Sequence, residues 1–308
     1  MTHADALEPV LLTPHVALRR VEIVVNPKSG GVGPKAAGEC EALLERLGLE
    51  ANIVEAEPPH VDTAIGAALE THPDVLIVLA GDGTARTAAC MAGVNGPLIA
   101  PLPGGTMNLL PRALYGTTDW KKALERALTE GLSRTVAGGE VDGRPFYVAA
   151  ILGNPALWAP ARESLREAKI RLAWLYAKRA ARRAFSRRIR FQVDGREFRK
   201  GEALTLLSPL ISKAMDDPVA LEAAFLDLKN PGEAFRLGAT SLFKDWRDDP
   251  SVEIFQAQTI RAWAKDPIPA LLDGEPTELG REAEIRFLPV AFKALAPARD
   301  ETPWTGSA

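Results

Sequence analysis

The sequence predicts an α/β protein of two domains, a doubly wound α/β domain followed by a mainly antiparallel β domain with a helical insertion. Three observations support this fold class. The 308 residues exceed the size at which a single hydrophobic core stops growing. In the first half, short β-branched runs alternate with helical stretches, as in parallel sheets covered by helices. From about residue 135, Asp-Gly turns separate alternating apolar runs, which is typical of antiparallel hairpins.

The first half begins with a β-branched strand at 21–25, and a Gly-rich loop leads from it into an amphipathic helix. That helix carries Cys40, Leu43, Leu44 and Leu47 on one face. The run 75–79 is apolar throughout, which indicates a strand buried on both faces of a parallel sheet. The pattern also predicts strands at 52–54 and 97–102, a helix after the strand at 75–79, and helices at 63–70, 107–114 and 120–132.

The second half contains three Asp-Gly dipeptides, at 142–143, 194–195 and 273–274. Asp-Gly suits a two-residue hairpin turn because both central residues of such a turn need a positive φ. Alternating apolar residues flank these turns, so antiparallel strands are expected. One helical stretch rich in Arg, about 161–186, interrupts them.

The composition is that of a globular protein, with 46% hydrophobic and 25% charged residues. A formal net charge of −3 provides no global attraction to nucleic acid, and no nucleic-acid partner is expected. Cys40 and Cys90 stand in no metal-ligand or redox spacing, which fits a reducing cytosol. Residues 1–20 contain no secretory signal and no apolar run has membrane-spanning length, so a cytoplasmic protein is expected.

The first strand is followed by a Gly-rich loop, Asn26-Pro27-Lys28-Ser29-Gly30-Gly31-Val32-Gly33. Glycines let backbone N–H groups approach phosphate oxygens, and the N-terminus of the next helix adds positive potential. The loop is no Walker A motif, because G-x-x-x-x-G-K-[ST] does not occur. A flexible connection between strand and helix is the alternative interpretation.

The second loop, Ala80-Gly81-Asp82-Gly83-Thr84, follows the most apolar strand, and Thr84 is expected to cap the next helix. A carboxylate beside phosphates repels them unless it binds Mg²⁺, accepts a proton or orients another group. Asp82 is therefore a candidate for chemistry, against the plainer interpretation of an Asp-Gly turn.

The third loop, Pro103-Gly104-Gly105-Thr106-Met107-Asn108, again joins a strand to a helix. Loops at the ends of neighbouring parallel strands meet at one edge of the sheet, where open α/β folds place their ligands. The three loops together predict a phosphate-binding edge.

Taken in order, the three loops and Arg112 resemble the N-P-x-S-G, G-G-D-G-T and P-x-G-T-x-N-x-x-x-R motifs of diacylglycerol-kinase-type lipid kinases. Leu272-Asp273-Gly274-Glu275 is similar to the late D-G-E motif of that family, so the resemblance covers most of residues 20–296. It implies a nucleotide-binding domain at 18–134, to which 290–300 returns, and a β-sandwich lipid-substrate domain at 135–289. It also implies that ATP, with Mg²⁺, binds between them and is used to phosphorylate a lipid hydroxyl.

The resemblance further assigns roles to individual residues. Asp82 and Glu275 are the implied catalytic pair, and Asp82 is also an implied ligand of the Mg²⁺ that ATP carries. Phosphoryl transfer needs positioning, Mg²⁺ and a group that accepts the hydroxyl proton, which fits this pair. The implied ATP-binding residues are Asn26, Pro27, Lys28, Ser29, Gly30, Lys35, Gly81, Asp82, Gly83, Thr84, Gly105, Thr106 and Asn108.

Several positions depart from the family pattern. Ala80 replaces a Gly, which costs roughly 1 to 2 kcal/mol only if that position needs a left-handed backbone. Thr87 and Leu109 stand where many relatives have Glu and Asp. Glu275 is also open to interpretation as a plain hairpin residue, because it follows an Asp-Gly turn.

A second metal site is suggested by Asp216-Asp217-Pro218, which resembles a D-D-G segment that holds a structural Mg²⁺ in some bacterial members. Pro218 replaces the Gly and Glu222 is displaced by one position. An acidic turn is therefore favoured over a metal site at Asp216 and Asp217.

The Arg-rich stretch 162–190 contains eleven Lys or Arg and two Glu, and its apolar residues recur at helical spacing. Such a basic amphipathic stretch can lie on an anionic membrane, or it can be a solvated helix face. Peripheral contact with the inner face of the membrane is thus one expectation. The oligomeric state is left open, a homodimer included.

Two rival functions remain. NAD kinases share the G-G-D-G-T loop and phosphorylate a soluble substrate, but the later motifs and the basic stretch favour a lipid. A catalytically silent lipid- or nucleotide-binding protein is the other rival, and the retention of Asp82 and Glu275 argues against it. The acceptor lipid, which could be diacylglycerol or a related lipid, is not determined.

Overall fold

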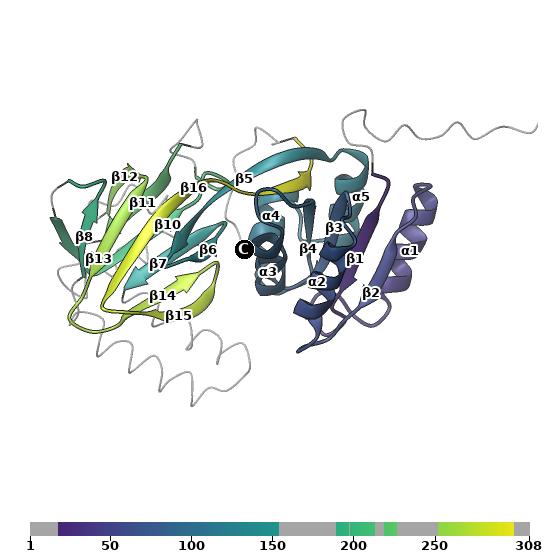
Figure 1. The fold of residues 1–308 in the computed structure, drawn as a ribbon, viewed down its shortest axis with the longest axis horizontal. Coiled ribbons are helices and arrows are strands. Elements are labelled where there is room, and N and C mark those ends of the chain that lie inside the picture. Colours follow the sequence, from purple (N-terminus) through teal and green to yellow (C-terminus); the bar gives the residue numbers. More distant parts are fainter. Residues whose placement is uncertain (1–17, 154–188, 197, 213–218, 227–251, 299–308) are drawn as a thin grey trace, which may run out of the picture. The chain divides into compact units, whose positions relative to one another are not determined.

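The computed structural model describes residues 18–153, 189–196, 198–212, 219–226 and 252–298 (Figure 1). The chain divides into two compact units. The first extends to Val136 and resumes at Val290, and the second is Ala137–Pro289. The basic stretch 162–188 and the pair Asp216 and Asp217 lie outside the described residues.

The first unit is built on a parallel sheet with the strand order β2-β1-β3-β4. The chain moves outward from β1 to β2 and then crosses back over β1 to β3, so the topological switch point lies between β1 and β3. β1, β3 and β4 are buried along their whole length, and their sequences are apolar apart from Glu22 in β1. The strands are β1 (Val21–Val25), β2 (Asn52–Glu55), β3 (Val75–Ala80) and β4 (Leu98–Pro103).

Helices connect these strands and bury their apolar residues in the unit. Trp120, Leu124 and Leu128 form the buried side of α5, and the Asp119 carboxylate caps this helix by accepting the backbone N–H groups of Lys121 and Lys122. The helices are α1 (Ala36–Arg46), α2 (Val61–Glu70), α3 (Asp82–Ala92), α4 (Leu109–Tyr115) and α5 (Trp120–Thr129). Among the described residues, none of the helices has the length and apolarity needed to cross a bilayer.

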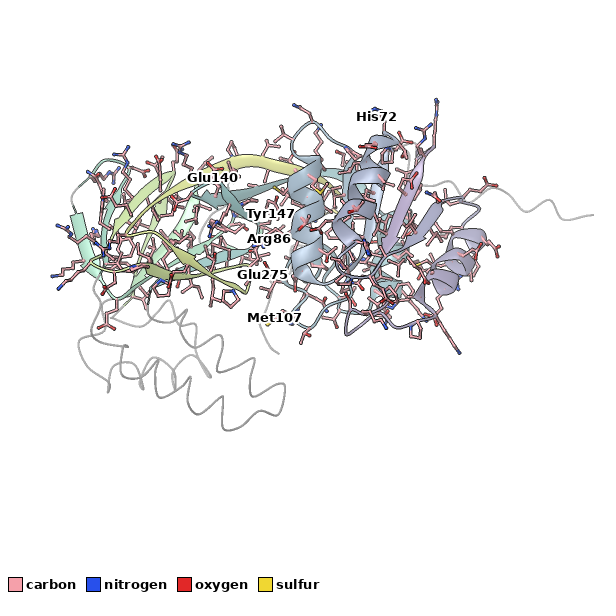
Figure 2. The ribbon with its side chains drawn as sticks, turned by 60° about the horizontal axis from the view of Figure 1, so that its bottom comes forward. His72, Arg86, Met107, Glu140, Tyr147 and Glu275 are labelled. Carbon is pink, nitrogen blue, oxygen red and sulfur yellow. The ribbon has the colours of Figure 1, made fainter. Side chains whose placement is uncertain are left out.

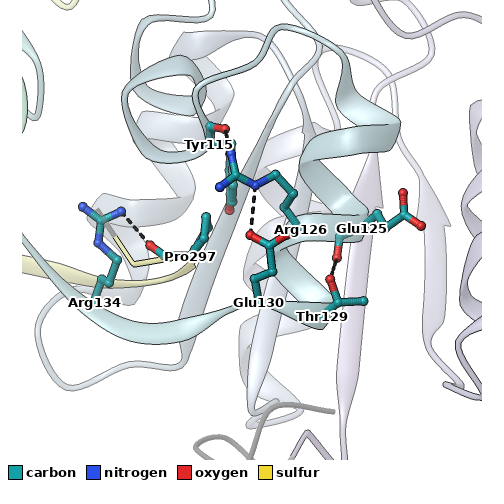
Figure 3. A network of polar contacts seen from close by, with 7 residues as sticks. All are labelled: Tyr115, Glu125, Arg126, Thr129, Glu130, Arg134 and Pro297. Atoms are coloured by element: carbon teal, nitrogen blue, oxygen red, sulfur yellow. Dashed lines mark hydrogen bonds and ion pairs between the residues drawn. The ribbon is translucent and has the colours of Figure 1, made fainter. Parts of the chain in front are cut away.

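The C-terminal part of β16 (Glu282–Ala296) completes the first unit, where Ala294 pairs with Ile99 of β4 in parallel. Two side chains hold this segment by its backbone carbonyls, and Figure 3 shows one of the two bonds, from Arg134 to Pro297. The buried Tyr115 hydroxyl donates to the Leu295 carbonyl at 2.8 Å, and Arg134 donates to the Pro297 carbonyl at 3.0 Å. Arg126 in turn donates to the Tyr115 carbonyl at 2.7 Å. The returning segment is therefore fastened by hydrogen bonds as well as by strand pairing.

Replacing Tyr115 by Phe is expected to destabilise the first unit by about 1 to 2 kcal/mol, because the buried Leu295 carbonyl loses its hydroxyl donor. The ring and its packing are kept, so the loss isolates the hydrogen bond. Urea unfolding of the variant beside the wild type measures it, and an unchanged midpoint would show that this hydroxyl contributes nothing to stability.

The second unit consists of two antiparallel sheets. One has the order β12-β11-β10-β7-β14-β15, and the other contains β9-β8-β13 with the first part of β16, to which β5 and β6 are joined. The strands that lie wholly or partly in this unit, besides β16, are β5 (Leu132–Val141), β6 (Arg144–Phe146), β7 (Ala149–Gly153), β8 (Ile189–Val193), β9 (Phe198–Gly201), β10 (Ala203–Leu207), β11 (Leu221–Leu226), β12 (Val252–Ala257), β13 (Thr259–Trp263), β14 (Ile268–Leu272) and β15 (Glu275–Leu279).

One hydrophobic core fills this unit and draws on both sheets. Phe191 of β8 and Phe225 of β11 meet edge to face with ring centroids 5.4 Å apart. Phe146, Leu206, Ile260 and other buried residues complete the same cluster. The predicted fold class, a doubly wound α/β part with an antiparallel β part, is confirmed.

The two cysteines differ in burial, and this difference has a testable consequence. Cys40 in α1 is buried, whereas Cys90 in α3 is exposed. Burial, with a smaller contribution from Glu39, raises the pKa of the Cys40 thiol from 9.0 to about 12. The thiolate is the reactive form. Iodoacetamide at about pH 8 is therefore expected to label Cys90 alone in the folded protein and both cysteines after unfolding.

Peptide mass spectrometry measures this labelling, and equal rates at the two cysteines of the folded protein would contradict the burial of Cys40. The same pKa change gives a pH dependence. Because the folded pKa is the higher one, the stability that Cys40 contributes is fully present below pH 9.0 and is lost as pH rises toward about 12.

Candidate active site

The three Gly-rich loops lie at the carboxyl ends of β1, β3 and β4, and the first two border the switch point between β1 and β3. We call residues 26–35 loop 1, residues 80–84 loop 2 and residues 103–108 loop 3. Open α/β sheets bind ligands in the crevice outside such a switch point. Strand order therefore places all three loops where a ligand of this unit would bind.

Loop 1 is shaped by Asn26, which is buried. Its backbone N–H donates to the Leu79 carbonyl of β3 at 2.9 Å, and its side-chain Oδ1 accepts the backbone N–H of Lys28 at 3.0 Å. Pro27 and Ser29 are half-buried, and Lys28, Gly30 and Lys35 are exposed. Lys28 forms an exposed ion pair with Glu57 at 3.6 Å. The loop thus has a fixed backbone and an exposed, basic and glycine-rich outer side.

The backbone of loop 3 forms hydrogen bonds with both other loops. Its Gly104 carbonyl accepts the N–H of Gly31 in loop 1 at 2.9 Å, and its Gly104 N–H donates to the Ala80 carbonyl in loop 2 at 3.0 Å. A Cβ on Gly104 would lie 2.8 Å from that same carbonyl oxygen, and a Cβ on Gly105 would lie 2.9 Å from Gly81 Cα. The three loops are therefore in direct contact. This close approach requires glycine at positions 104 and 105, because any Cβ there would clash.

Loop 2 leads directly into α3, which begins at Asp82 with the extended Gly81 as its N-cap. The expectation that Thr84 caps this helix is wrong, because Thr84 already lies within the first turn. A carboxylate in the first turn is favourable there, since the helix dipole is positive at that end. Ala80 is a residue of β3 and has no positive φ, so its replacement of a Gly causes no backbone strain.

Asp82 is half-buried, and its Oδ1 atom is buried. Arg86 follows one turn later on the same helix, where side chains four residues apart are neighbours. Figure 2 shows Arg86 on α3 and Met107 in loop 3. Sequence reasoning overlooked Arg86, although its spacing from Asp82 within the predicted helix was a usable signal. Gly83, Thr84 and Gly105 are half-buried and Thr106 is exposed.

Asn108 ends loop 3 and is the N-cap of α4. It is buried and has a left-handed backbone, with φ 51° and ψ 42°. Its Oδ1 accepts the Gly105 N–H at 2.7 Å, and its Nδ2 donates to the Gly105 carbonyl at 3.0 Å. Leu109 is the first residue of α4, so the helix begins later than the sequence pattern indicated.

Glu275 belongs to the second unit, where it is the first residue of the edge strand β15 and is half-buried. It pairs with Leu272 across the turn formed by Asp273 and Gly274, both of which have positive φ. The two-residue turn geometry expected from Asp-Gly is therefore present. The pairing of Glu275 with Asp82 of the first unit stays a prediction.

Asp273 is a residue whose importance the sequence did not indicate. It is buried, and its carboxylate accepts three backbone N–H groups, from Tyr147 at 2.7 Å, Val148 at 2.8 Å and Ala149 at 2.9 Å. The backbone N–H of Asp273 donates to the Ala149 carbonyl at 2.8 Å. Asp273 thus ties the turn that carries Glu275 to the segment before β7; Tyr147 and Glu275 are both labelled in Figure 2.

The candidate for a second metal site is only partly described. Glu222 is buried on β11, and its carboxylate accepts the Ser212 hydroxyl at 2.5 Å. Within the described part of the chain, no group of three or more His, Cys, Asp or Glu side chains is arranged to hold a metal ion. Asp216 and Asp217, the two residues of the predicted site, lie outside that part of the chain.

The fold and the three interlocked loops define a class of α/β protein in which glycine-rich loops meet at the switch point of a parallel sheet. In a comparison with known families, residues 20–141 match the family model of the diacylglycerol kinase catalytic domain. The resemblance inferred from the loop motifs is therefore confirmed for these residues.

Two curated relatives agree with this match, and one solved structure shares the fold. The diacylglycerol kinases of Staphylococcus saprophyticus and Staphylococcus carnosus are 31% identical over 142 residues and 32% identical over 146 residues. Each alignment covers 44% of this chain, and the aligned parts are 46% and 45% of the two relatives, so the chain matches less than half the length of either one. A diacylglycerol kinase structure from Bacillus anthracis shares the fold over 91% of this chain and 98% of its own, with a TM-score of 0.64 and 14% identity.

Proposed function

We propose that this protein is an ATP-dependent lipid kinase that transfers the γ-phosphoryl group to a lipid hydroxyl, diacylglycerol or a related lipid. The observation that carries the proposal is the interlocking of three glycine-rich loops at the switch point of a parallel sheet. The similarity of residues 20–141 to diacylglycerol kinase catalytic domains supports the choice of ATP as donor and of a lipid as acceptor.

The residues of this edge fit a nucleotide triphosphate. Gly30 in loop 1 is exposed, and a Cβ built on it would meet only the Thr106 hydroxyl at 4.0 Å, so the space beside its backbone is open. The N-terminus of α3 and the basic side chains of Lys28 and Lys35 add positive potential. Backbone N–H groups, hydroxyls and lysines are the groups that bind phosphate oxygens.

The residues also fit a metal ion that arrives with ATP. Asp82 is the carboxylate of the three loops, and one carboxylate with substrate phosphates is the usual protein contribution to a Mg²⁺ site. Mg²⁺ bound there would neutralise charge on the phosphates during transfer. The protein's own part is to hold the phosphates through the loops and to place Asp82 beside them.

In the proposed reaction, the lipid hydroxyl oxygen forms a bond to the γ-phosphorus while the bond from that phosphorus to the β–γ bridging oxygen breaks, and ADP leaves. The hydroxyl proton passes to a carboxylate. Glu275 is proposed to accept it, or to orient Asp82 so that Asp82 accepts it.

An assay of ATP turnover at equal protein concentration tests this function, with mixed micelles containing a panel of lipids in one arm and NAD in the other. Labelled ATP and mass analysis of the products identify the acceptor. If ATP were turned over with NAD and with none of the lipids, the protein would be a kinase of a soluble substrate and the proposal of a lipid kinase would be wrong. ATP binding without turnover on either would indicate a silent binding protein.

Replacing Gly30 by Val is expected to weaken ATP binding by at least about tenfold, because the branched side chain would occupy space that the phosphates need, and about 1.4 kcal/mol corresponds to that factor. The fold should survive, since nothing in the chain lies closer than 4.0 Å to the new Cβ. Calorimetry with ATP measures the affinity. Gly38→Ala in α1, where a Cβ meets nothing within 4 Å, is the matched control. Unchanged ATP affinity in Gly30→Val would remove loop 1 from the binding site.

Contact with anionic membrane is part of the proposal and depends on the basic stretch 162–190. Attraction between exposed charges is screened at a Debye length of about 8 Å in physiological salt. Binding to phosphatidylglycerol vesicles should therefore fall as salt rises.

A further inference from the structure

Two asparagines of the loop motifs, Asn26 and Asn108, are buried, and their side chains bind the backbone of their own loops. The resemblance to kinases assigned both to the nucleotide. We propose instead that they are positioning residues, which hold the phosphate-facing backbone of loops 1 and 3 in place without contacting the nucleotide. This inference rests on the proposed function for its effect on ATP, but its structural part stands without it.

Asn108 makes a two-point contact with a single residue. Its Oδ1 accepts the Gly105 N–H at 2.7 Å, and its Nδ2 donates to the Gly105 carbonyl at 3.0 Å. Both polar atoms of the carboxamide are thereby engaged three residues back in the same loop. With 7% of its surface exposed, Asn108 has little area left for a ligand.

The backbone at residue 108 explains why Asn suits this position. The φ of 51° and ψ of 42° are left-handed, a conformation that Gly and Asn adopt at low cost. Glycine would satisfy the backbone but supplies no carboxamide. Asn combines the backbone conformation with the side chain that fixes Gly105.

Fixing Gly105 also fixes the contact between loops 2 and 3. A Cβ built on Gly105 would lie 2.9 Å from Gly81 Cα and 3.4 Å from the backbone nitrogen of Asp82. The Gly105 peptide, which Asn108 orients, therefore lies against the first residue of α3. That residue is Asp82, which carries the proposed catalytic carboxylate. A shift of this peptide would displace the Gly81 and Asp82 backbone.

Asn26 performs the same task in loop 1. Its Oδ1 accepts the Lys28 N–H at 3.0 Å, and its backbone carbonyl accepts the Ser29 N–H at 3.1 Å. Asn26 has 6% of its surface exposed. The N–H groups of Lys28 and Gly105 are thus used within the protein, which leaves phosphate binding to other groups of the loops.

The test measures amide hydrogen exchange by NMR in the protein without nucleotide, for wild type, Asn108→Gly and Asn108→Asp. Asn108→Gly keeps the left-handed backbone and removes the carboxamide, so the Gly105 amide should exchange at least about tenfold faster. Asn108→Asp keeps the acceptor for that amide but replaces the Nδ2 donor by an oxygen that faces the Gly105 carbonyl, so its exchange rate should lie between those of Asn108→Gly and the wild type. Asn95→Gly, at an exposed turn of the same unit, is the control and should leave Gly105 unchanged.

ATP affinity is then measured on the same proteins and should follow the same order, with Asn108→Gly weakest and Asn108→Asp between it and the wild type. For loop 1, Asn26→Ala and Asn26→Asp are compared in the same way at the Lys28 amide. An unchanged Gly105 exchange rate in folded Asn108→Gly protein would overturn the proposal. So would weaker ATP binding by Asn108→Asp than by Asn108→Gly, because a carboxylate in direct contact with phosphates would repel them. If the wild type binds no ATP, the proposed function fails, while the exchange rates still decide the role of the asparagines.

Discussion

Glu275→Gln is expected to lower kcat on an accepted lipid by roughly 10² to 10⁴-fold, about 3 to 5.5 kcal/mol of barrier, while ATP affinity is kept. Gln has the size and the hydrogen-bonding reach of Glu but cannot take the hydroxyl proton. Asp82→Asn should cost at least as much, because Asp82 is also the proposed ligand of the metal that ATP carries. The double variant should lose far less than the product of the two effects if the carboxylates act as one unit.

The measurement is kcat for the four proteins on one lipid, with folding checked by thermal melting. Glu278→Gln is the matched control, because Glu278 is an exposed residue of the same strand β15 and side chains three residues apart on a strand point to opposite faces. If Glu275→Gln keeps more than about half of the wild-type turnover, far short of the loss expected for a base, Glu275 is an ordinary hairpin residue.

Asp273→Asn is expected to destabilise the second unit by about 2 to 4 kcal/mol, because charge-assisted hydrogen bonds are among the stronger ones and unsatisfied buried donors are costly. The carboxylate accepts three N–H groups with two oxygens, whereas Asn offers one acceptor oxygen and an NH₂ group that would face a backbone N–H. Urea unfolding of the second unit measures the loss.

Asp142→Asn is the control for this variant. Asp142 has the same position in the turn between β5 and β6, with a positive φ, and it is exposed. Its Oδ1 accepts a single N–H, from Glu284 at 2.8 Å. A loss within about 1 kcal/mol is expected there. If the two variants unfold at the same urea concentration, the three hydrogen bonds of Asp273 contribute no more to stability than the single hydrogen bond of Asp142.

Much of the fold could be predicted because its signals are local. The β-branched run at β1 indicated a strand, the uninterrupted apolar run at β3 indicated a buried parallel strand, and the three Asp-Gly turns indicated hairpins. Periodicity and turn chemistry act within a few residues, so they can be evaluated along the sequence. The meeting of the three loops at one edge of the sheet could also be predicted, since parallel strands end at a common edge.

Element boundaries were less predictable, for a physical reason visible in two helices. α3 begins at Asp82 rather than after Thr84, because the extended Gly81 allows the helix to begin directly after β3. α4 begins at Leu109, because Asn108 has a left-handed backbone and its side chain accepts a hydrogen bond from the Gly105 N–H. A Thr or an Asn near a helix start suits several cap positions, and the surrounding loops select among them.

The sequence by itself determined the kinds of element, the positions of the loops and the resemblance to a diacylglycerol kinase catalytic domain. Only the tertiary structure decided which groups these residues meet. Asp273 receives N–H groups from residues more than 120 positions earlier, and Gly31 donates to Gly104, more than 70 positions later. Such hydrogen bonds depend on which strands become neighbours, and strand order follows from packing the whole chain. Asp273 and Asp142 both begin an Asp-Gly turn with positive φ, so their different roles arise from their neighbours in space.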